Sequence, residues 1–164
     1  MKIAGLLHDS IVDGPGLRYA VFTQGCMICC PQCHNPESWD VGGGLEAAVD
    51  EIIADMLKNP LIDGLTLSGG EPFIQAADCA SIAAAAREAG LNVWVFTGFV
   101  FEDLFEKSKS DQAVGGLLNL SDVIVDGKYI ASKRTLSKKW CGSANQRVID
   151  VKESLRVGEI ILLS

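Results

Sequence analysis

Four of the six cysteines in this 164-residue chain fall between positions 26 and 33. Three of them, Cys26, Cys30 and Cys33, have the spacing C-x3-C-x2-C. Three thiolates on one loop can each bind one iron of a cubane iron–sulfur cluster, which leaves the fourth iron open to an external ligand. A cluster that only transfers electrons normally takes four cysteines. The spacing therefore favours an iron–sulfur centre that also binds a small molecule.

A zinc site and a set of free thiols are the alternatives for this loop. Structural zinc usually takes two pairs of ligands, and the isolated Cys79 and Cys141 do not form a second pair. Cys29 also leaves a second register open, because Cys26, Cys29 and Cys33 have the spacing C-x2-C-x3-C.

The elements that must position the cysteines alternate between strand and helix. Strands are predicted at 17–23, 64–67, 91–96, 122–125, 147–151 and 160–163, and helices at 46–58, 75–89, 102–107 and 113–118. This alternation is typical of βαβ units and of a mainly parallel sheet.

We therefore expect an α/β fold in one domain that spans residues 1–164. A complete eight-stranded barrel takes about 250 residues, so the chain is expected to form a partial (β/α) TIM-like barrel of about six strands, open on one side. Active sites of such folds lie at the carboxyl ends of the strands. The cysteine loop and three further polar segments follow predicted strands: Gly69–Pro72, Thr97–Gly98 and Asp126–Lys128.

Composition narrows the class of partner. Apolar residues make up 48% of the chain and charged residues 21%, as in globular proteins, and the net charge is −7. A net negative charge argues against a nucleic-acid partner. The apolar run at the N-terminus is too short for a signal peptide, and no run approaches the ~20 apolar residues of a membrane span. We expect a cytoplasmic protein with no membrane partner. In the reducing cytoplasm, clustered cysteines more often bind metal than form disulfides.

The combined motifs resemble those of the radical S-adenosylmethionine enzymes, in which C-x3-C-x2-C follows the first strand and Gly-Gly-Glu-Pro the second. Ser10–Arg18 is similar to the glycyl-radical-enzyme activases. Three further segments resemble the activating enzymes of anaerobic ribonucleotide reductase: Cys33–Glu37, Val125–Lys128 and Gly142–Arg147. The resemblance spans about Ser10 to Val151 and selects Cys26, Cys30 and Cys33 as cluster ligands. It departs from the family at Cys29, which is added, and at Gln32, where many members carry an aromatic residue.

The resemblance implies a mechanism. S-adenosylmethionine would bind the open iron of a [4Fe-4S] cluster, and one electron would cleave its sulfonium bond to give a 5′-deoxyadenosyl radical. That radical would remove a hydrogen atom from a glycine in the large subunit of the reductase, with a flavodoxin as the expected electron donor. The alternatives within the class are a pyruvate formate-lyase activase and a radical enzyme acting on a small molecule. A zinc-binding interaction domain is the alternative outside it.

The same resemblance assigns cofactor contacts to Gly69-Gly70-Glu71-Pro72. The glycines would let the backbone approach the methionine moiety, Glu71 would accept a hydrogen bond from its ammonium group, and Pro72 would fix the turn. A plain strand-to-helix turn is the alternative.

Weaker assignments fall on three other segments. Asp126 and Lys128 would lie close to the cofactor, with Lys128 binding its carboxylate, or would belong to a solvated turn. Asn145 would lie over the ribose or adenine of the cofactor or would only order a loop. Thr97 is a further candidate contact. Asp13-Gly14-Pro15-Gly16 would receive the glycine loop of the partner, or would be a structural turn.

Overall fold

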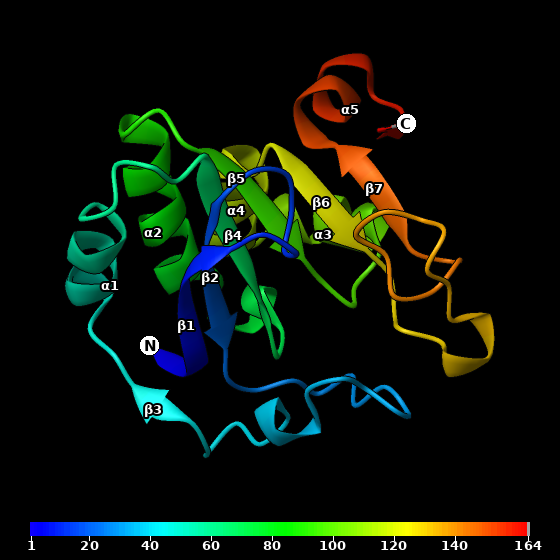
Figure 1. The fold of residues 1–164 in the computed structure, drawn as a ribbon. Helices are drawn as coiled ribbons and strands as arrows, with labels where there is room; N and C mark the ends of the chain where they lie inside the picture. Colours follow the sequence, from blue (N-terminus) through cyan, green and yellow to red (C-terminus); the bar gives the residue numbers. More distant parts are fainter. Residues whose placement is uncertain (164) are drawn as a thin grey trace.

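One mixed β-sheet organises the computed structural model, which describes residues 1–163. Within those residues the order of the eight strands is β3-β1-β2-β4-β5-β6-β7-β8. The strands are β1 (Lys2–Ser10), β2 (Arg18–Thr23), β3 (Leu45–Glu46), β4 (Gly64–Gly69), β5 (Asn92–Phe96), β6 (Val123–Asp126), β7 (Arg147–Asp150) and β8 (Ile161–Leu162). The central strands β2, β4, β5 and β6 are parallel, and the outer ones pair antiparallel. The carboxyl ends of the parallel strands therefore meet at one edge, where the loops after β2 and β6 both lie (Figure 1).

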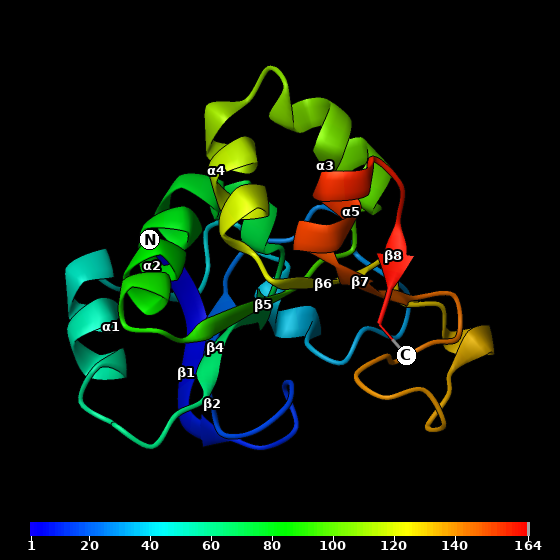
Figure 2. The ribbon, with the colours of Figure 1, turned by 90° about the horizontal axis from the view of Figure 1, so that it is seen from above.

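The helices lie along one face of this sheet (Figure 2). They are α1 (Val49–Met56), α2 (Ala76–Glu88), α3 (Phe101–Ser108), α4 (Gln112–Leu120) and α5 (Val151–Val157). Alternate strand residues such as Tyr19, Leu65 and Val95 pack with these helices in the main core, and each is fully buried. Burial of these apolar side chains is the main source of stability for the sheet.

The opposite face of the sheet is more polar and is covered in part by the loop after β6. Trp94 of β5 packs against Trp140 of that loop, with ring centroids 4.8 Å apart. Arg18 of β2 is fully buried beside them. Its guanidinium donates to Thr66 Oγ1 (3.0 Å), Asn92 Oδ1 (2.6 Å) and the Leu65 carbonyl (2.7 Å). Burial lowers the pKa of Arg18 to about 10, so the side chain stays charged at neutral pH.

The α/β class and the parallel centre of the sheet are confirmed, whereas the strand count is wrong. The sequence predicts about six strands, and the sheet has eight within residues 1–163. Strand β1 was missed because its pairing with β2 shifts register twice, which breaks the alternating pattern. The predicted helix at 46–58 begins only at Val49, because Leu45–Glu46 forms β3.

Helix α5 was also missed, although its sequence carries a start signal. The Asp150 side chain accepts from the Glu153 amide at 2.9 Å, which is the capping pattern of an acidic residue three positions before a glutamate. None of the helices in residues 1–163 has the length and apolar character needed to cross a membrane.

Arg18 gives a test of the polar face. Arg18→Met removes the donors and leaves the buried Leu65 carbonyl and the half-buried Asn92 Oδ1 without them, which should lower the free energy of unfolding by about 3 kcal/mol. Anaerobic urea denaturation measures this change. Arg156→Met, which breaks only an exposed pair with Glu153, should leave the free energy of unfolding nearly unchanged. Equal stability of the two variants would contradict the assignment.

Candidate active site

The cysteine loop is held at both ends by backbone hydrogen bonds. Gly25 N donates to the Ser38 carbonyl at 2.8 Å, and Cys26 N donates to the Trp39 carbonyl at 3.0 Å. Cys26 is buried, Cys30 and Cys33 are half-buried, and all six cysteines of the chain are free thiols. The Asn35 amide donates to Cys33 Sγ at 3.4 Å, a contact of the kind that tunes cluster sulfurs.

Cys29 differs from its neighbours in exposure and backbone conformation. It is exposed, has a φ of 47°, and its thiol donates to the Cys26 carbonyl at 3.2 Å. It does not line the cavity that the other three cysteines share.

That cavity has a volume of about 130 Å³ and brings both sequence motifs together. Cys26, Cys30 and Cys33 line one part of it, and Gly69-Gly70 and Thr97 line another. The predicted meeting of the cysteine loop and the glycine motif at the strand ends is therefore present in the structure.

The donor set fits a cubane cluster. No group of three His, Cys, Asp or Glu side chains within residues 1–163 could hold a single metal ion. A cubane makes a different demand, because each thiolate binds a different iron. Three free thiols on one cavity meet that demand, and Trp39 on the same wall has a buried Nε1 without a partner. Burial raises the pKa of the Cys26 thiol, and bound iron would favour its thiolate.

The two glycines are required by the protein's own backbone. Gly69 has a φ of +95°, and a Cβ there would lie 2.5 Å from Thr23 N. A Cβ on Gly70 would overlap the Gly25 carbonyl. The end of β4 therefore packs directly on the chain that leaves β2, and this contact places the glycine motif against the cysteine loop.

Glu71 is fully buried and is used by the protein itself. Its Oε1 accepts from Thr97 Oγ1 (2.8 Å) and Phe73 N (3.1 Å), and its Oε2 accepts from Gly98 N (2.9 Å). Burial raises the pKa of Glu71 to about 7, and these three donors partly oppose that shift. The predicted bond from Glu71 to the cofactor ammonium stays a prediction. The following residue, Pro72, begins a 3-10 turn that leads into α2.

A second cavity, of about 770 Å³, adjoins the first. Both are lined by Ile28, Gly98 and Gly127. The larger one holds the predicted contacts Lys128 and Asn145. Asn145 Nδ2 donates to the Lys128 carbonyl at 2.8 Å, while its Oδ1 is buried without a partner and can accept from a ligand.

The wall of this larger cavity includes an ion network whose pairing the sequence did not predict, although two of its members, Asp126 and Arg147, lie in segments that the sequence singles out. Asp126 is buried and accepts from Phe101 N at 2.8 Å and Arg147 Nε at 3.0 Å. Arg147 also contacts both carboxylate oxygens of Glu102, at 3.0 and 2.7 Å. A charged residue at the end of a strand was the available signal for Asp126 and Arg147, but Glu102 gave none.

The predicted partner turn lies on a third cavity, of about 470 Å³. The Asp13 carbonyl accepts from Thr66 Oγ1 at 2.7 Å, and the Asp13 carboxylate accepts from Ser10 Oγ at 2.5 Å. Arg18 Nη1 donates to the Pro15 carbonyl at 3.4 Å. Asp13 lines this cavity with His34 and with Cys33, which also lines the 130 Å³ cavity. Gly14 and Gly16 have positive φ, as a tight turn requires.

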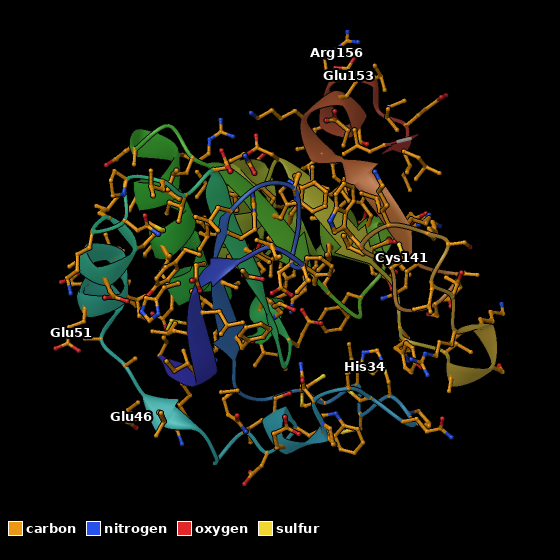
Figure 3. The ribbon with its side chains drawn as sticks, in the orientation of Figure 1. His34, Glu46, Glu51, Cys141, Glu153 and Arg156 are labelled. Carbon is orange, nitrogen blue, oxygen red and sulfur yellow. The ribbon has the colours of Figure 1, made fainter. Side chains whose placement is uncertain are left out.

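Two loops face each other across the third cavity. His34 belongs to the cysteine loop and Cys141 to the loop after β6, and both residues line it (Figure 3). The His34 ring also lies 5.0 Å from the ring of Tyr129.

Comparison with known proteins agrees with this geometry. Residues 12–149 match the family described as a 4Fe-4S single cluster domain. The chain is 35% identical over 145 residues to the anaerobic ribonucleoside-triphosphate reductase-activating protein of Vibrio cholerae, covering 83% of this chain and 89% of that protein. The protein of the same name from Escherichia coli K12 is 34% identical, with 84% and 91% covered.

A longer relative also matches. The pyruvate formate-lyase 1-activating enzyme of Escherichia coli K12 is 30% identical over 166 residues, which cover 94% of this chain and 64% of that enzyme. The crystal structure of QueE from Escherichia coli covers 59% of this chain and 52% of its own, at 15% identity and a TM-score of 0.45, a likeness too weak to support an argument.

These matches define the class as 4Fe-4S single-cluster proteins. Within that class, the chain belongs to the radical S-adenosylmethionine activating enzymes, which use a [4Fe-4S] cluster and S-adenosylmethionine to generate glycyl radicals.

The cavity predicts which cysteines bind the cluster. Cys26→Ala, Cys30→Ala and Cys33→Ala should each prevent assembly, because an iron loses its only protein ligand, whereas Cys29→Ala should retain about four irons per chain. Iron and sulfide analysis after anaerobic reconstitution measures this. Loss of the cluster in Cys29→Ala, with retention in Cys30→Ala, would establish the alternative register.

Glu71 predicts a pH dependence of stability in the cluster-free protein. Its pKa is about 7 when folded against 4.5 for the free side chain. The folded state therefore holds a proton that the unfolded state releases between these values. Stability should fall as pH rises through that window, by on the order of 3 kcal/mol, and level off above it.

Urea denaturation at about pH 5 and about pH 8 measures the slope. Glu71→Gln cannot titrate, so the fall in the free energy of unfolding with rising pH should be lost. Glu51→Gln, an exposed control on α1, should keep this fall. Identical pH profiles for the wild type and Glu71→Gln would contradict the raised pKa.

Proposed function

We propose that this chain activates the large, glycyl-radical subunit of an anaerobic ribonucleoside-triphosphate reductase. The observation that carries the proposal is the identity of 35% and 34% to two reductase-activating proteins, over 83% and 84% of this chain. The chain spans 89% and 91% of two reductase-activating proteins. It spans only 59% and 64% of two formate-lyase-activating enzymes, although their identities are 34% and 30%.

We assign the site residues within this function. Cys26, Cys30 and Cys33 hold three irons, and Gly69 and Gly70 with Thr97 form the wall beside the open iron. Lys128 and the free Oδ1 of Asn145 supply a cation and an acceptor in the adjoining cavity. When bound, the cluster supplies the electron that cleaves S-adenosylmethionine. The residues of the chain bind and orient the cofactor and exclude water.

The outline of the sheet supports access for a macromolecule. We propose that residues 1–164 form one radical S-adenosylmethionine domain shaped as a laterally open, partial barrel. Support comes from the strand order, in which β3 and β8 are separate edges within residues 1–163. Asp13–Gly16, on the cavity that reaches Cys33, would then contact the glycine loop of the partner.

The proposed environment follows from the thiols. Six free cysteines, three of them for an iron–sulfur cluster, suit the reducing cytoplasm, with a flavodoxin as donor and no nucleic-acid or membrane partner. A formate-lyase activase is the second candidate, because enzymes of that name match at up to 34% identity.

Activation assays distinguish the two candidates. The reconstituted chain, reduced with S-adenosylmethionine, should produce a glycyl signal by electron paramagnetic resonance in the reductase and form 5′-deoxyadenosine. A reductase whose radical glycine is replaced by alanine, and the Cys30→Ala activase, should give no such signal. A signal in a formate-lyase and none in the reductase would replace the proposal with the second candidate.

A further inference from the structure

The segment between Asp126 and Asp150 has a charge unlike that of the rest of the molecule. It contains six basic residues and no acidic one, in a chain whose net charge is −7. Four of the six lie close together in the loop after β6: Lys133, Arg134, Lys138 and Lys139. This set is called the basic loop below.

Among the residues that the structure describes, the cations of the basic loop have no acidic partner. Within residues 1–163 none of the four lies within ion-pair distance of a carboxylate. Seven cations elsewhere in the chain do have one: Lys58, Arg87, Lys107, Lys109, Arg147, Lys152 and Arg156. Four cations without an ion pair are therefore gathered in one loop, where they produce a local positive field.

The basic loop is a fixed platform. Ala144 N donates to the Lys133 carbonyl at 2.8 Å, Thr135 N donates to the Gly142 carbonyl at 3.2 Å, and Lys138 Nζ donates to the Gln146 carbonyl. Trp140 anchors the loop on Trp94 of β5. Lys133, Arg134 and Lys139 are exposed, so a partner would meet these charges already in place.

An apolar side chain projects from the same loop. Leu136 is 92% exposed, the largest exposed fraction among the large apolar residues of the chain. It lines the 470 Å³ cavity with Lys138 and Lys139, and that cavity also contains Asp13 and Cys33. The platform is thus continuous with the proposed partner turn and with one cluster ligand.

We propose that the basic loop is the electrostatic docking element for an acidic surface of the glycyl-radical protein, with Leu136 as its apolar contact. The inference rests on the proposed function and adds the chemistry of the partner's surface. Opposite charges would accelerate encounter and orient the partner's glycine toward Cys33. An exposed leucine amid the cations fits a protein surface better than a nucleic acid, because base stacking requires aromatic side chains.

Charge reversal tests the proposal against a matched control. The variant Lys133→Glu, Arg134→Glu, Lys139→Glu is compared with Lys58→Glu, Lys107→Glu, Lys109→Glu, which changes the net charge equally at other exposed positions. The first should raise the reductase concentration for half-maximal glycyl radical by about tenfold or more at low salt. The control should change it less than about twofold. Raising the salt should bring the wild type toward the reversed variant.

A second readout separates docking from chemistry. Reductive cleavage of S-adenosylmethionine without the partner should be the same in all three proteins, because these lysines and Arg134 lie outside the cofactor cavities. Leu136→Ser should raise the reductase concentration for half-maximal glycyl radical. The dependence of that concentration on salt should stay as in the wild type. If charge reversal prevents folding, a variant with glutamine at the same three positions replaces it. That variant should raise the reductase concentration for half-maximal glycyl radical by a smaller factor.

The outcomes are distinguishable. No glycyl radical in the reductase with wild-type protein would overturn the proposed function. If the wild type activates the reductase and the charge-reversed variant does so equally well, only the docking inference would be overturned. The docking inference would also be overturned if charge reversal weakened only the binding of ATP or of a DNA oligonucleotide, each measured by fluorescence anisotropy. Half-saturation by the reductase would then be unchanged.

Discussion

The carboxylate of Glu71 is hydrogen-bonded to the chain beyond the ends of two neighbouring strands, β4 and β5, and it has no solvent exposure. Its own amide donates to the Gly25 carbonyl at 2.9 Å, next to the first cysteine of the loop that follows β2. Loss of this carboxylate would leave the Thr97 hydroxyl and the Gly98 amide without their acceptor in a buried position. The relative positions of the cysteine loop, the glycine turn and Thr97 therefore depend on one buried residue, through its amide and its carboxylate.

Burying a carboxylate costs free energy, and the residues around Glu71 reduce that cost by donating hydrogen bonds to it. Burial disfavours the charged form of Glu71 and raises its pKa to about 7. Near neutral pH both the protonated and the charged form are therefore populated. Gly69 and Gly70 let the chain before Glu71 pack directly on Thr23 and Gly25, which brings the Glu71 amide to the Gly25 carbonyl. On the other side of the sheet Arg18 solves a similar problem, because neutral acceptors surround its buried charge and tie β2 to the turn at Pro15.

The sequence predicted the parts of this arrangement that depend on local pattern. The central strands, the helices of the main core and the shared position of the motifs follow from periodicity and from the rule that parallel strands end together. The acceptor role of Glu71 did not follow, because Thr97 is 26 residues away and only packing brings the two together. The Arg147 network was missed for the same reason, since Asp126 and Glu102 come from distant segments. Strand β1 was missed because register shifts in its pairing with β2 break the alternating pattern.

An enzyme that makes a radical on another protein has conflicting requirements at its active site. Its cofactor must be shielded from water, yet a glycine of the partner must reach it. In this chain the strand ends and the cysteine loop line a small, open cavity, while the loop after β6 covers only part of the polar face of the sheet. The partner would then complete the enclosure on arrival. Shielding by the partner meets both requirements, because the docked subunit would exclude water and bring its glycine to the cavity.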